Sequence, residues 1–314
     1  MALLKDIQFS YDDLDGFFGK ALGTEYPDFT CALYNGDFTL TLDEAQKRKR
    51  DFVLNSLQFE RGKKILDIGC GWGNMLNWIR EKGGAGVGVT LSPAQARRCQ
   101  KNGLEAHLKD WKEMSQTDFG RFDGIVSLGA FEHFCSMEEF VGGKQERIYS
   151  NFMKLCSDLL PSKGRLFLQT MTWGKNLPWG AQYPTKMEEF KKLLDPRAPL
   201  RSDERTLYLV VSFFPGSFLP KGKEQILETA SPYFNVVNES NGRLDYLQTV
   251  RKWEEAMLKN GSGSSQFTLK VLAKYCFGGP QGRAWINTIK ESAMMHVFAG
   301  QIFDHYRLVF EKKD

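Results

Sequence analysis

The stretch ILDIGCGWG, residues 65–73, is an apolar run of strand-forming residues that leads directly into the spacing Gly-x-Gly-x-Gly. Glycine has no Cβ, so Gly69, Gly71 and Gly73 allow a sharp turn and a close approach of a ligand to the backbone. Residues 74–82 follow with apolar side chains at helical spacing. A strand that turns into a helix in this way presents the free N–H groups of the helix start. The stretch therefore predicts the ligand-binding edge of a parallel sheet.

The spacing and charge of this turn bear on the kind of ligand. Dinucleotide-binding enzymes carry G-x-G-x-x-G, in which a pyrophosphate lies at the helix start. Here the third glycine comes one residue earlier, and Asp67 stands just before the turn. A carboxylate suits the cationic, amine-bearing end of S-adenosylmethionine better than it suits a phosphate. On this motif alone, a tight connection without a ligand stays open as the alternative.

Short β-rich runs alternate with segments of helical periodicity along most of the chain. Strands are predicted over residues 64–68, 86–91, 124–128, 165–170, 234–239 and 306–311, with a weaker one over 106–109. The best-marked helices are predicted over residues 74–82, 93–102, 146–160 and 223–229. Glycine- and serine-rich stretches at 261–265 and 278–282 are expected to be loops. This alternation is typical of an α/β fold with a mostly parallel sheet and helices on both faces.

Two segments do not follow the alternation, and both are expected to cover the carboxyl edge of the sheet. Residues 1–57 are predicted to be helical, with a Thr-Leu-Asp-Glu sequence that resembles a helix cap, and residues 173–222 are rich in Pro, Lys and aromatic residues. We therefore expect an N-terminal cap (1–57), a cofactor-binding core (58–172), a substrate cover (173–222) and a completion of the core with a helical insertion (223–314). Together they would form one compact domain.

Composition limits the classes of partner and compartment. The chain has 314 residues, and its 42 Lys and Arg against 38 Asp and Glu leave a net charge of +4. This balance does not indicate a nucleic-acid surface and suits a neutral or apolar substrate. The six cysteines lie far apart without a C-x-x-C pair, so neither a metal site nor a disulfide framework is predicted, and a reducing cytoplasm fits.

The beginning of the chain and its longest apolar runs bear on membranes. The start, MALLKDIQFSYDD, becomes charged at Lys5 and lacks a long apolar run, and no stretch reaches transmembrane length. We therefore expect a soluble, cytoplasmic protein. The first helix and the segment around 267–277 are candidates for peripheral contact with a membrane surface. The sequence does not indicate an oligomeric state.

Several strings resemble those of the cyclopropane fatty acid synthase and mycolic acid methyltransferase family. They are LDIGCGWG (66–73), GVTLSPAQ (88–95), IVSLGAFEHF (125–134), SYD (10–12), FTCA (29–32), FPG (214–216) and YLQTV (246–250) followed by Trp253. The glycine motif is shared by many methyltransferases, whereas GAFEHF and TLSxxQ are more specific. The resemblance spans nearly the whole chain. It implies a Rossmann-like class I methyltransferase fold with a seven-stranded sheet and a helical cover, and an S-adenosylmethionine-dependent methyltransferase.

The resemblance also implies which residues hold the cofactor. Contacts are expected at Tyr11, Phe29, Thr30, Asp67, Gly69, Gly71, Gly73, Thr90, Leu91, Gln95, Trp111 and Leu128. Tyr11 would close over the cofactor from the first helix. Many methyltransferases place an acidic residue at the end of the second strand for the ribose hydroxyls, but this sequence has VTL at 89–91. Thr90 and Gln95 are expected to supply polar contacts instead, while Trp111 has core packing as its alternative role.

The implied reaction is methyl transfer to an alkene carbon through a carbocation. An alkene is a poor nucleophile, so the reaction needs alignment in a dry pocket and stabilisation of the cation by aromatic faces or a carboxylate. In the resembled family a bicarbonate ion, held by a Cys backbone, a Glu, a His and a Tyr, removes the proton that closes a cyclopropane ring. Cys31, Glu132 and Tyr246 match three of these four residues.

The fourth position departs from the family pattern, because a His-Thr-x-Thr string is replaced by QTMT at 169–172. Gln169 can donate a hydrogen bond but cannot become cationic as His can. Bicarbonate binding is therefore open, and direct general-base work by Glu132 is the alternative, provided burial raises its pKa. The product would then be a methylated alkene. His133 rivals Glu132 as base, and a structural pair of these two residues, or a merely buried Cys31, is the alternative without catalysis.

The substrate is the least determined part of the prediction. The leading hypothesis is an unsaturated fatty acyl lipid that undergoes cyclopropanation or methyl branching. The first alternative is a prenyl diphosphate or other terpenoid alkene, which the basic residues of the cover would suit. N- or O-methylation of a small molecule and a non-catalytic cofactor-binding protein are further alternatives.

Overall fold

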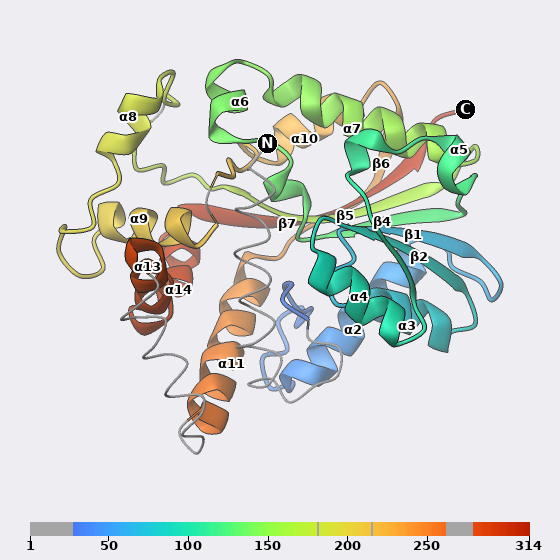
Figure 1. Ribbon diagram of the computed structural model, residues 1–314, viewed down its shortest axis with the longest axis horizontal. Helices are drawn as coiled ribbons and strands as arrows, with labels where there is room; N and C mark the ends of the chain where they lie inside the picture. Colours follow the sequence, from blue (N-terminus) through green and yellow to red (C-terminus); the bar gives the residue numbers. More distant parts are fainter. Residues whose placement is uncertain (1–27, 181, 215, 262–278) are drawn as a thin grey trace.

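The computed structural model describes residues 28–180, 182–214, 216–261 and 279–314. Within them, a seven-stranded sheet in the order β3-β2-β1-β4-β5-β7-β6 forms the centre of the molecule (Figure 1). The strands are β1 (Lys64–Ile68), β2 (Ala85–Thr90), β3 (Glu105–Leu108), β4 (Gly124–Leu128), β5 (Arg165–Trp173), β6 (Phe234–Asn241) and β7 (Phe303–Lys312). Strands β1 to β5 pair in parallel, whereas β7 is antiparallel to both β5 and β6. The mostly parallel seven-stranded sheet predicted from the sequence is confirmed.

Helices cover both faces of this sheet (Figure 1). In the described residues they are α2 (Leu42–Ser56), α3 (Asn74–Glu81), α4 (Pro93–Lys101), α5 (Gln116–Phe119), α6 (Met137–Val141), α7 (Gln145–Leu159), α8 (Met187–Lys192), α9 (Asp203–Phe213), α10 (Lys223–Ala230), α11 (Arg243–Gly261), α13 (Gly279–Lys290) and α14 (Ala293–Ala299). Two short 3₁₀ helices, η1 (Trp111–Glu113) and η2 (Phe131–His133), follow β3 and β4. Helices α7 and α10 lie on one face of the sheet, and α2 and α3 on the other.

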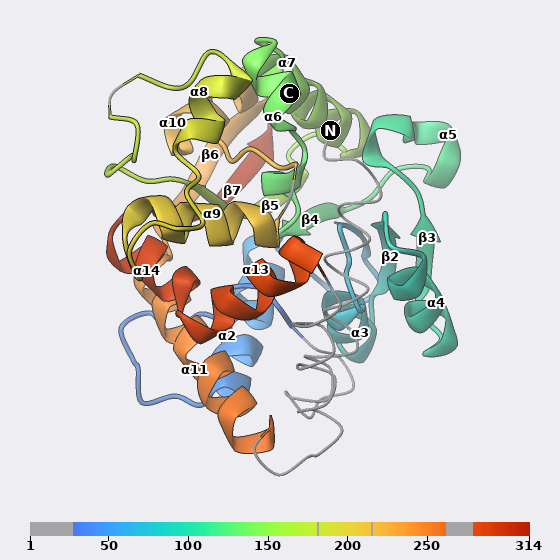
Figure 2. The ribbon, with the colours of Figure 1, turned by 60° about the vertical axis from the view of Figure 1, so that its left-hand side comes forward.

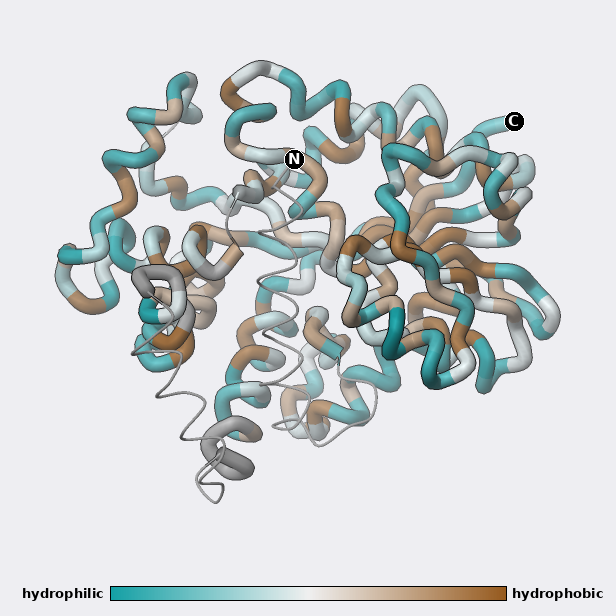
Figure 3. The backbone as a smooth tube through the Cα atoms, viewed as in Figure 1, coloured by the Kyte–Doolittle hydropathy of each residue, from teal (hydrophilic) through white to brown (hydrophobic). Residues whose placement is uncertain are grey.

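Two hydrophobic layers hold the helices to the sheet. Successive side chains of a strand point to opposite faces. Leu66 and Leu166 accordingly belong to the layer beneath α7 and α10, while their neighbours Ile65 and Phe167 belong to the layer against α2 and α3. The central strands are therefore hydrophobic on both sides, and much of their length is coloured as hydrophobic in Figure 3. This double burial is the reason the strands appear in the sequence as continuous apolar runs.

A third hydrophobic cluster lies beyond the end of β5, where α9, α11, α13 and α14 gather (Figure 2). Trp173, the last residue of β5, packs edge-on against Phe303 at a ring distance of 5.1 Å. Strand β5 continues past the predicted end at residue 170 because it pairs with β7 along its full length, up to Trp173 opposite Phe303. This cluster is thus joined to the sheet through the paired ends of β5 and β7.

Two predictions of local structure were wrong. Residues 28–41, part of the segment predicted to be helical, form turns and irregular chain before α2. Thr41 and Glu44 form the reciprocal hydrogen bonds of a capping box at the start of α2, as the sequence suggested. The expected loop at 278–282 is instead mostly helix, because α13 begins at Gly279. Pro280 is compatible with a first helical turn, where its missing N–H has no helical partner to lose.

Some predictions fall outside the described residues. These are the first helix with Tyr11, nearly all of the 261–265 loop, and the candidate membrane segment at 267–277. In the part of the chain that the structure describes, no helix is long and apolar enough to cross a membrane. The five described cysteines are all buried and free. The division into cap, core, cover and completion stays a prediction.

Candidate functional site

A pocket lies where β1, β2 and β4 end, at the carboxyl edge of the sheet. Ligands of open α/β sheets bind at this edge. All but two of the predicted cofactor residues line it, namely Phe29, Thr30, Asp67, Gly69, Gly71, Thr90, Leu91, Gln95, Trp111 and Leu128. Tyr11 lies outside the described residues, and Gly73 is not on the wall.

The glycine turn after β1 has the left-handed backbone that its sequence indicates. Gly69, Gly71 and Gly73 have φ angles of +85°, +53° and +83°. Above Gly71 no heavy atom lies within 4 Å of the place a Cβ would occupy, so this glycine leaves space for a ligand. At Gly73 a Cβ would meet Leu104 at 2.6 Å and Cys99 at 2.9 Å. Gly73 therefore allows close packing of the turn against α4, and it faces away from the pocket.

Polar groups at the end of β2 replace the acidic residue that many methyltransferases carry there. Thr90 donates from Oγ1 to Gln95 Oε1 at 2.7 Å, and the Ser92 N–H donates to Thr90 Oγ1 at 3.2 Å. Ser92 also caps α4 by accepting from the Gln95 N–H. The cap and the side-chain bond together fix Gln95 at the pocket wall.

Trp111 lies between the pocket and the core. It lines the pocket, and its ring packs at 5.0 Å from Phe134 and at 5.3 Å from Phe152 in the main core. The indole is thus a rigid wall, held from behind by η2 and α7. Phe29 is similarly held against Trp72, at a ring distance of 5.0 Å.

Asp67 is a buried carboxylate at the bottom of the pocket, with 2% of its surface exposed. Burial, assisted by the negative charge of Asp28 and opposed by Lys49, raises the pKa of Asp67 to about 7. A buried anion of this kind is stabilised by a cationic ligand group. The site therefore suits the ammonium end of an amino-acid cofactor.

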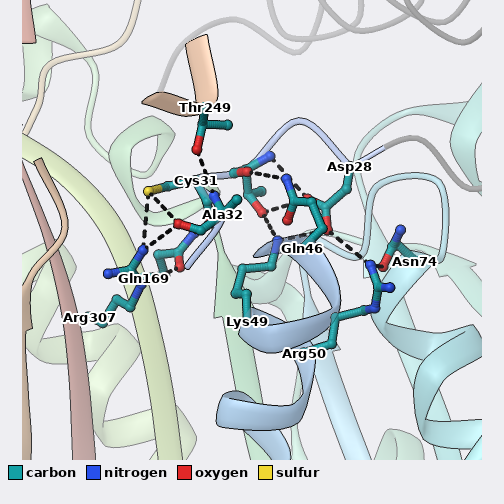
Figure 4. A network of polar contacts seen from close by, with 11 residues as sticks. Asp28, Cys31, Ala32, Gln46, Lys49, Arg50, Asn74, Gln169, Thr249 and Arg307 are labelled. Atoms are coloured by element: carbon teal, nitrogen blue, oxygen red, sulfur yellow. Dashed lines mark hydrogen bonds and ion pairs between the residues drawn. The ribbon is translucent and has the colours of Figure 1, made fainter. Parts of the chain in front are cut away.

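A buried lysine organises the loop that closes this side of the pocket (Figure 4). Lys49, which is fully buried, donates to Asp28 Oδ2 at 2.7 Å and to Thr30 Oγ1 at 2.5 Å. Gln46, one turn earlier on α2, donates to the Thr30 carbonyl at 2.9 Å. Helix α2 thereby holds residues 28–30 against the cofactor pocket. No motif in the sequence indicates this role of α2.

Glu132 and His133 lie in η2, just after β4, and their surroundings shift their pKa values in opposite directions. Thr170 donates to Glu132 Oε2 at 2.9 Å, and burial raises the pKa of Glu132 to about 7 against the opposing hydrogen bonds. His133 Nδ1 lies 2.8 Å from Ser217 Oγ, and burial lowers the pKa of His133 to about 4. At neutral pH, His133 is uncharged while Glu132 is near its titration midpoint. His133 and Gly129 both line the cofactor pocket. A Cβ placed on Gly129 would lie 3.7 Å from Glu132 Oε1, so the Glu132 carboxylate is close to the pocket wall.

A buried arginine joins Cys31 and Gln169 into one network (Figure 4). Gln169 donates from Nε2 to the Cys31 carbonyl at 3.2 Å and accepts from Arg307 Nε at 3.2 Å. Arg307 also donates to the Ala32 carbonyl at 2.7 Å, and its Nη1 pairs with Asp245 Oδ2 at 3.0 Å. The amide of Gln169 is therefore oriented by the protein at both ends.

Tyr246 belongs to the same neighbourhood, because it follows Asp245 on α11. Its ring packs at 4.5 Å from Phe298 and 5.1 Å from His305, and it shares a hydrophobic cluster with Cys31. Burial raises the pKa of the Cys31 thiol to about 12, so the thiol stays protonated. Among the predicted catalytic residues, His133 is on the described pocket wall, whereas Cys31, Glu132, Gln169 and Tyr246 are not. Gln169 lies next to that wall, because it pairs with Leu128 of β4.

Several residues of the site were missed from the sequence. The sequence could have indicated Arg307, because it interrupts the apolar strand 306–310, and Asp245, because it adjoins Tyr246. Arg50, Asn74 and Lys109 also line the cofactor pocket, but no motif marks them. In the described residues, no group of His, Cys, Asp or Glu is arranged to hold a metal ion.

Fold and pocket together define a class, the Rossmann-like methyltransferases, and comparison with known proteins gives the family. A family model described as mycolic acid cyclopropane synthetase matches residues 2–275. Cyclopropane mycolic acid synthase 2 of Mycobacterium leprae is 30% identical over 266 residues, covering 81% of this chain and 80% of the relative. Hydroxymycolate synthase MmaA4 of Mycobacterium tuberculosis is 28% identical over 273 residues, covering 84% and 81%.

A solved structure agrees over the whole chain. The crystal structure of mycolic acid cyclopropane synthase CmaA1 complexed with SAH and CTAB is similar with a TM-score of 0.72 and 26% identity, covering 99% of this chain and 98% of that one. The chain therefore belongs to the mycolic acid cyclopropane synthetase family. It is an S-adenosylmethionine-dependent methyltransferase with the class I fold that the sequence predicted.

The raised pKa of Asp67 leads to a pH-dependent affinity for the cofactor. Below about pH 7, Asp67 takes up a proton and can no longer pair with the cofactor's ammonium group. The affinity for S-adenosylhomocysteine should fall by up to about tenfold per pH unit below that point and level off above it. Calorimetric titration at several pH values measures this. Asp67→Asn should bind S-adenosylhomocysteine weakly at every pH. A wild-type affinity that stays constant over the titration range of one Asp, from about pH 6 to about pH 8, would contradict the assignment of Asp67.

The Arg307 network predicts a large loss of stability on substitution. Arg307→Met leaves Asp245 as a buried, uncompensated charge and removes the donor to Gln169. Breaking a buried ion pair on one side costs about 3–5 kcal/mol of unfolding free energy. Urea denaturation measures the loss, with Arg147→Gln on the exposed face of α7 as a control expected within about 0.5 kcal/mol of wild type. Equal stability of both variants would show that the ion pair contributes little.

Proposed function

We propose that this methyltransferase adds a methyl group to an alkene carbon of an unsaturated fatty acyl lipid, giving a cyclopropane or a methyl-branched alkene. The observation that carries the proposal is Glu132, a buried carboxylate next to the cofactor pocket whose pKa is raised to about 7. The names of the relatives, which include a cyclopropane mycolic acid synthase and a hydroxymycolate synthase, support a lipid substrate.

The chemistry needs a base close to a cation. When bound, S-adenosylmethionine supplies an electrophilic methyl group. The alkene electron pair forms the new C–C bond while the S–CH₃ bond breaks, so the neighbouring substrate carbon becomes positive. Glu132 then accepts a proton. Loss of that proton from the added methyl group closes a cyclopropane ring, and loss from an adjacent chain carbon leaves a methylated alkene.

Glu132 is better suited than His133 to accept this proton. A general base works best when its pKa lies near the operating pH. Burial holds the pKa of His133 at about 4, whereas it raises the pKa of Glu132 to about 7. His133 is also committed through Nδ1 to Ser217. We therefore assign proton removal to Glu132, with Thr170 orienting the carboxylate.

The network around Gln169 supports a reaction without bicarbonate. The position expected to hold the ion carries a neutral amide whose Oε1 accepts from Arg307 and whose Nε2 donates to the Cys31 carbonyl. Arg307 in turn is neutralised by Asp245. The cationic group that would favour an anion at this place is therefore already paired inside the protein.

The cover suits an apolar substrate more than a diphosphate. Its aromatic residues are closely packed, since the rings of Trp173 and Trp179 lie 4.6 Å apart and the ring of Phe218 stacks at 3.8 Å on Phe140 of α6. Among its basic residues, Arg205 is held by both oxygens of Glu291 at 2.7 and 2.5 Å. Such pairing lowers the capacity of the cover to bind a diphosphate group.

Glu132→Gln tests the proposal directly. The amide keeps the shape but cannot accept the proton, so the rate of product formation should fall by about 10²-fold or more. The affinity for S-adenosylhomocysteine should stay within about twofold, a difference below 0.5 kcal/mol, because Glu132 is not on the cofactor pocket wall. Mass spectrometry with a methyl-labelled cofactor and unsaturated fatty acyl phospholipid measures the product, which is one CH₂ heavier than the substrate.

The same assay separates the substrate classes. Geranyl and farnesyl diphosphate, and a panel of amines and hydroxyl compounds, are run beside the lipid. Label in a prenyl product with none in the lipid would replace the lipid by a terpenoid alkene. Label on nitrogen or oxygen alone would exclude methylation of an alkene.

The role of Glu132 also predicts how turnover responds to pH and to bicarbonate. Since the base must be ionised, kcat should rise with pH and reach a plateau above about pH 7. Turnover should be equal in carbonate-free buffer and in buffer with added bicarbonate. An activity that depends on added bicarbonate would instead show that the ion binds despite Gln169.

A further inference from the structure

Arg50 is a cation on the wall of the cofactor pocket that has no part in the chemistry described above. It extends from α2 toward the start of α3 (Figure 4). Its Nη1 donates to Asn74 Oδ1 at 3.1 Å, and its guanidinium lies 4.9 Å from the ring centre of Trp78. Only 16% of the side chain is exposed. Arg50 is therefore held in one place at the edge of the pocket.

Two other charged residues of the described pocket wall, Asp28 and Lys109, are already paired. Asp28 is paired with Lys49 at 2.7 Å, so its 3.9 Å distance to Arg50 is a secondary contact. Lys109, the other basic residue of the wall, pairs with Asp118 and lies over the Phe119 ring. Within the described residues, Arg50 Nε is buried without a hydrogen-bond partner. Of the two basic side chains, Arg50 has the greater remaining capacity to bind an anion.

The cofactor carries one group that needs such a cation. Its amino-acid end has an ammonium group, which suits Asp67, and an α-carboxylate, which needs a positive partner. Asn74 is the first residue of α3, directly after the glycine turn, and no acidic side chain lies in the first turn of that helix. The N–H groups of a helix start add positive potential there. Arg50 and Asn74 thus stand where the backbone also favours an anion.

We propose that Arg50, oriented by Asn74 and by Trp78, binds the α-carboxylate of S-adenosylmethionine and makes the enzyme selective for a cofactor that has this group. Planar guanidinium groups bind carboxylates through paired, charge-assisted hydrogen bonds. The inference depends on the use of S-adenosylmethionine. It does not depend on the identity of the methyl acceptor.

Binding measurements with two ligands test the inference. Calorimetric affinities are compared for S-adenosylhomocysteine and for its decarboxylated analogue, with wild type and Arg50→Gln. The variant should bind S-adenosylhomocysteine about 10- to 100-fold more weakly, because a charge-assisted pair is lost. Its affinity for the decarboxylated ligand should change by less than about threefold, under 1 kcal/mol. Arg50→Lys should lie between, because it keeps the charge and loses the planar fork.

Lys82→Gln provides the matched control. Lys82 lies 4.6 Å from the same Trp78 ring and pairs with Asp51, but it is not on the pocket wall. Both affinities should be unchanged in this variant. If Arg50→Gln weakens the binding of both ligands equally, or of neither, the assignment of Arg50 to the carboxylate is wrong. Because no methyl acceptor is present, these outcomes are independent of whether the lipid proposal holds.

Discussion

The site depends on one constraint, which is that the chain must turn sharply at the end of β1 while its backbone stays open to a ligand. The turn is fixed by its neighbours in the sheet. The N–H groups of Gly69 and Cys70 both donate to the Val89 carbonyl on β2, at 2.9 and 3.1 Å, and Ser127 on β4 donates to the Ile68 carbonyl at 3.0 Å. Left-handed glycines make this geometry accessible without strain. The pocket is therefore built from the central strands and inherits their rigidity.

Within this frame, burial sets the charge state of the two carboxylates that matter. Asp67 and Glu132 are both nearly inaccessible, and the pKa of each is raised to about 7 mainly by desolvation. They differ in what stands beside them. Asp67 faces the pocket, with Asp28 and Lys49 nearby, and this environment suits a cationic ligand. Glu132 accepts a hydrogen bond from the Thr170 hydroxyl and can exchange a proton. We therefore propose that the same physical cause serves cofactor binding at one place and proton transfer at the other.

The sequence predicted those features that depend on short spacing. Strand-like runs predicted all seven strands, most of which are buried on a sheet face, although β6 is largely exposed. The glycine spacing predicted the location of the pocket. It misjudged Gly73, because whether a glycine faces a ligand or a neighbouring helix depends on the packing of Cys99 and Leu104. It missed contacts between distant segments. Arg307 reaches Cys31 across 276 positions, and no local pattern indicates such a partner.

Arg307 explains why a glutamine suits position 169, where the family pattern has a histidine. A histidine beside a permanently charged guanidinium would resist protonation, as His305 illustrates, whose pKa is lowered by burial and then by Arg307. A neutral glutamine instead accepts the Arg307 N–H and passes a hydrogen bond to the Cys31 carbonyl. Asp245 completes the set and leaves it without net charge, which is the condition for keeping an arginine buried in this interior. The positive charge of Arg307 is thus fixed and neutralised by the protein. A change of protonation near neutral pH falls instead to Glu132, whose pKa is raised to about 7.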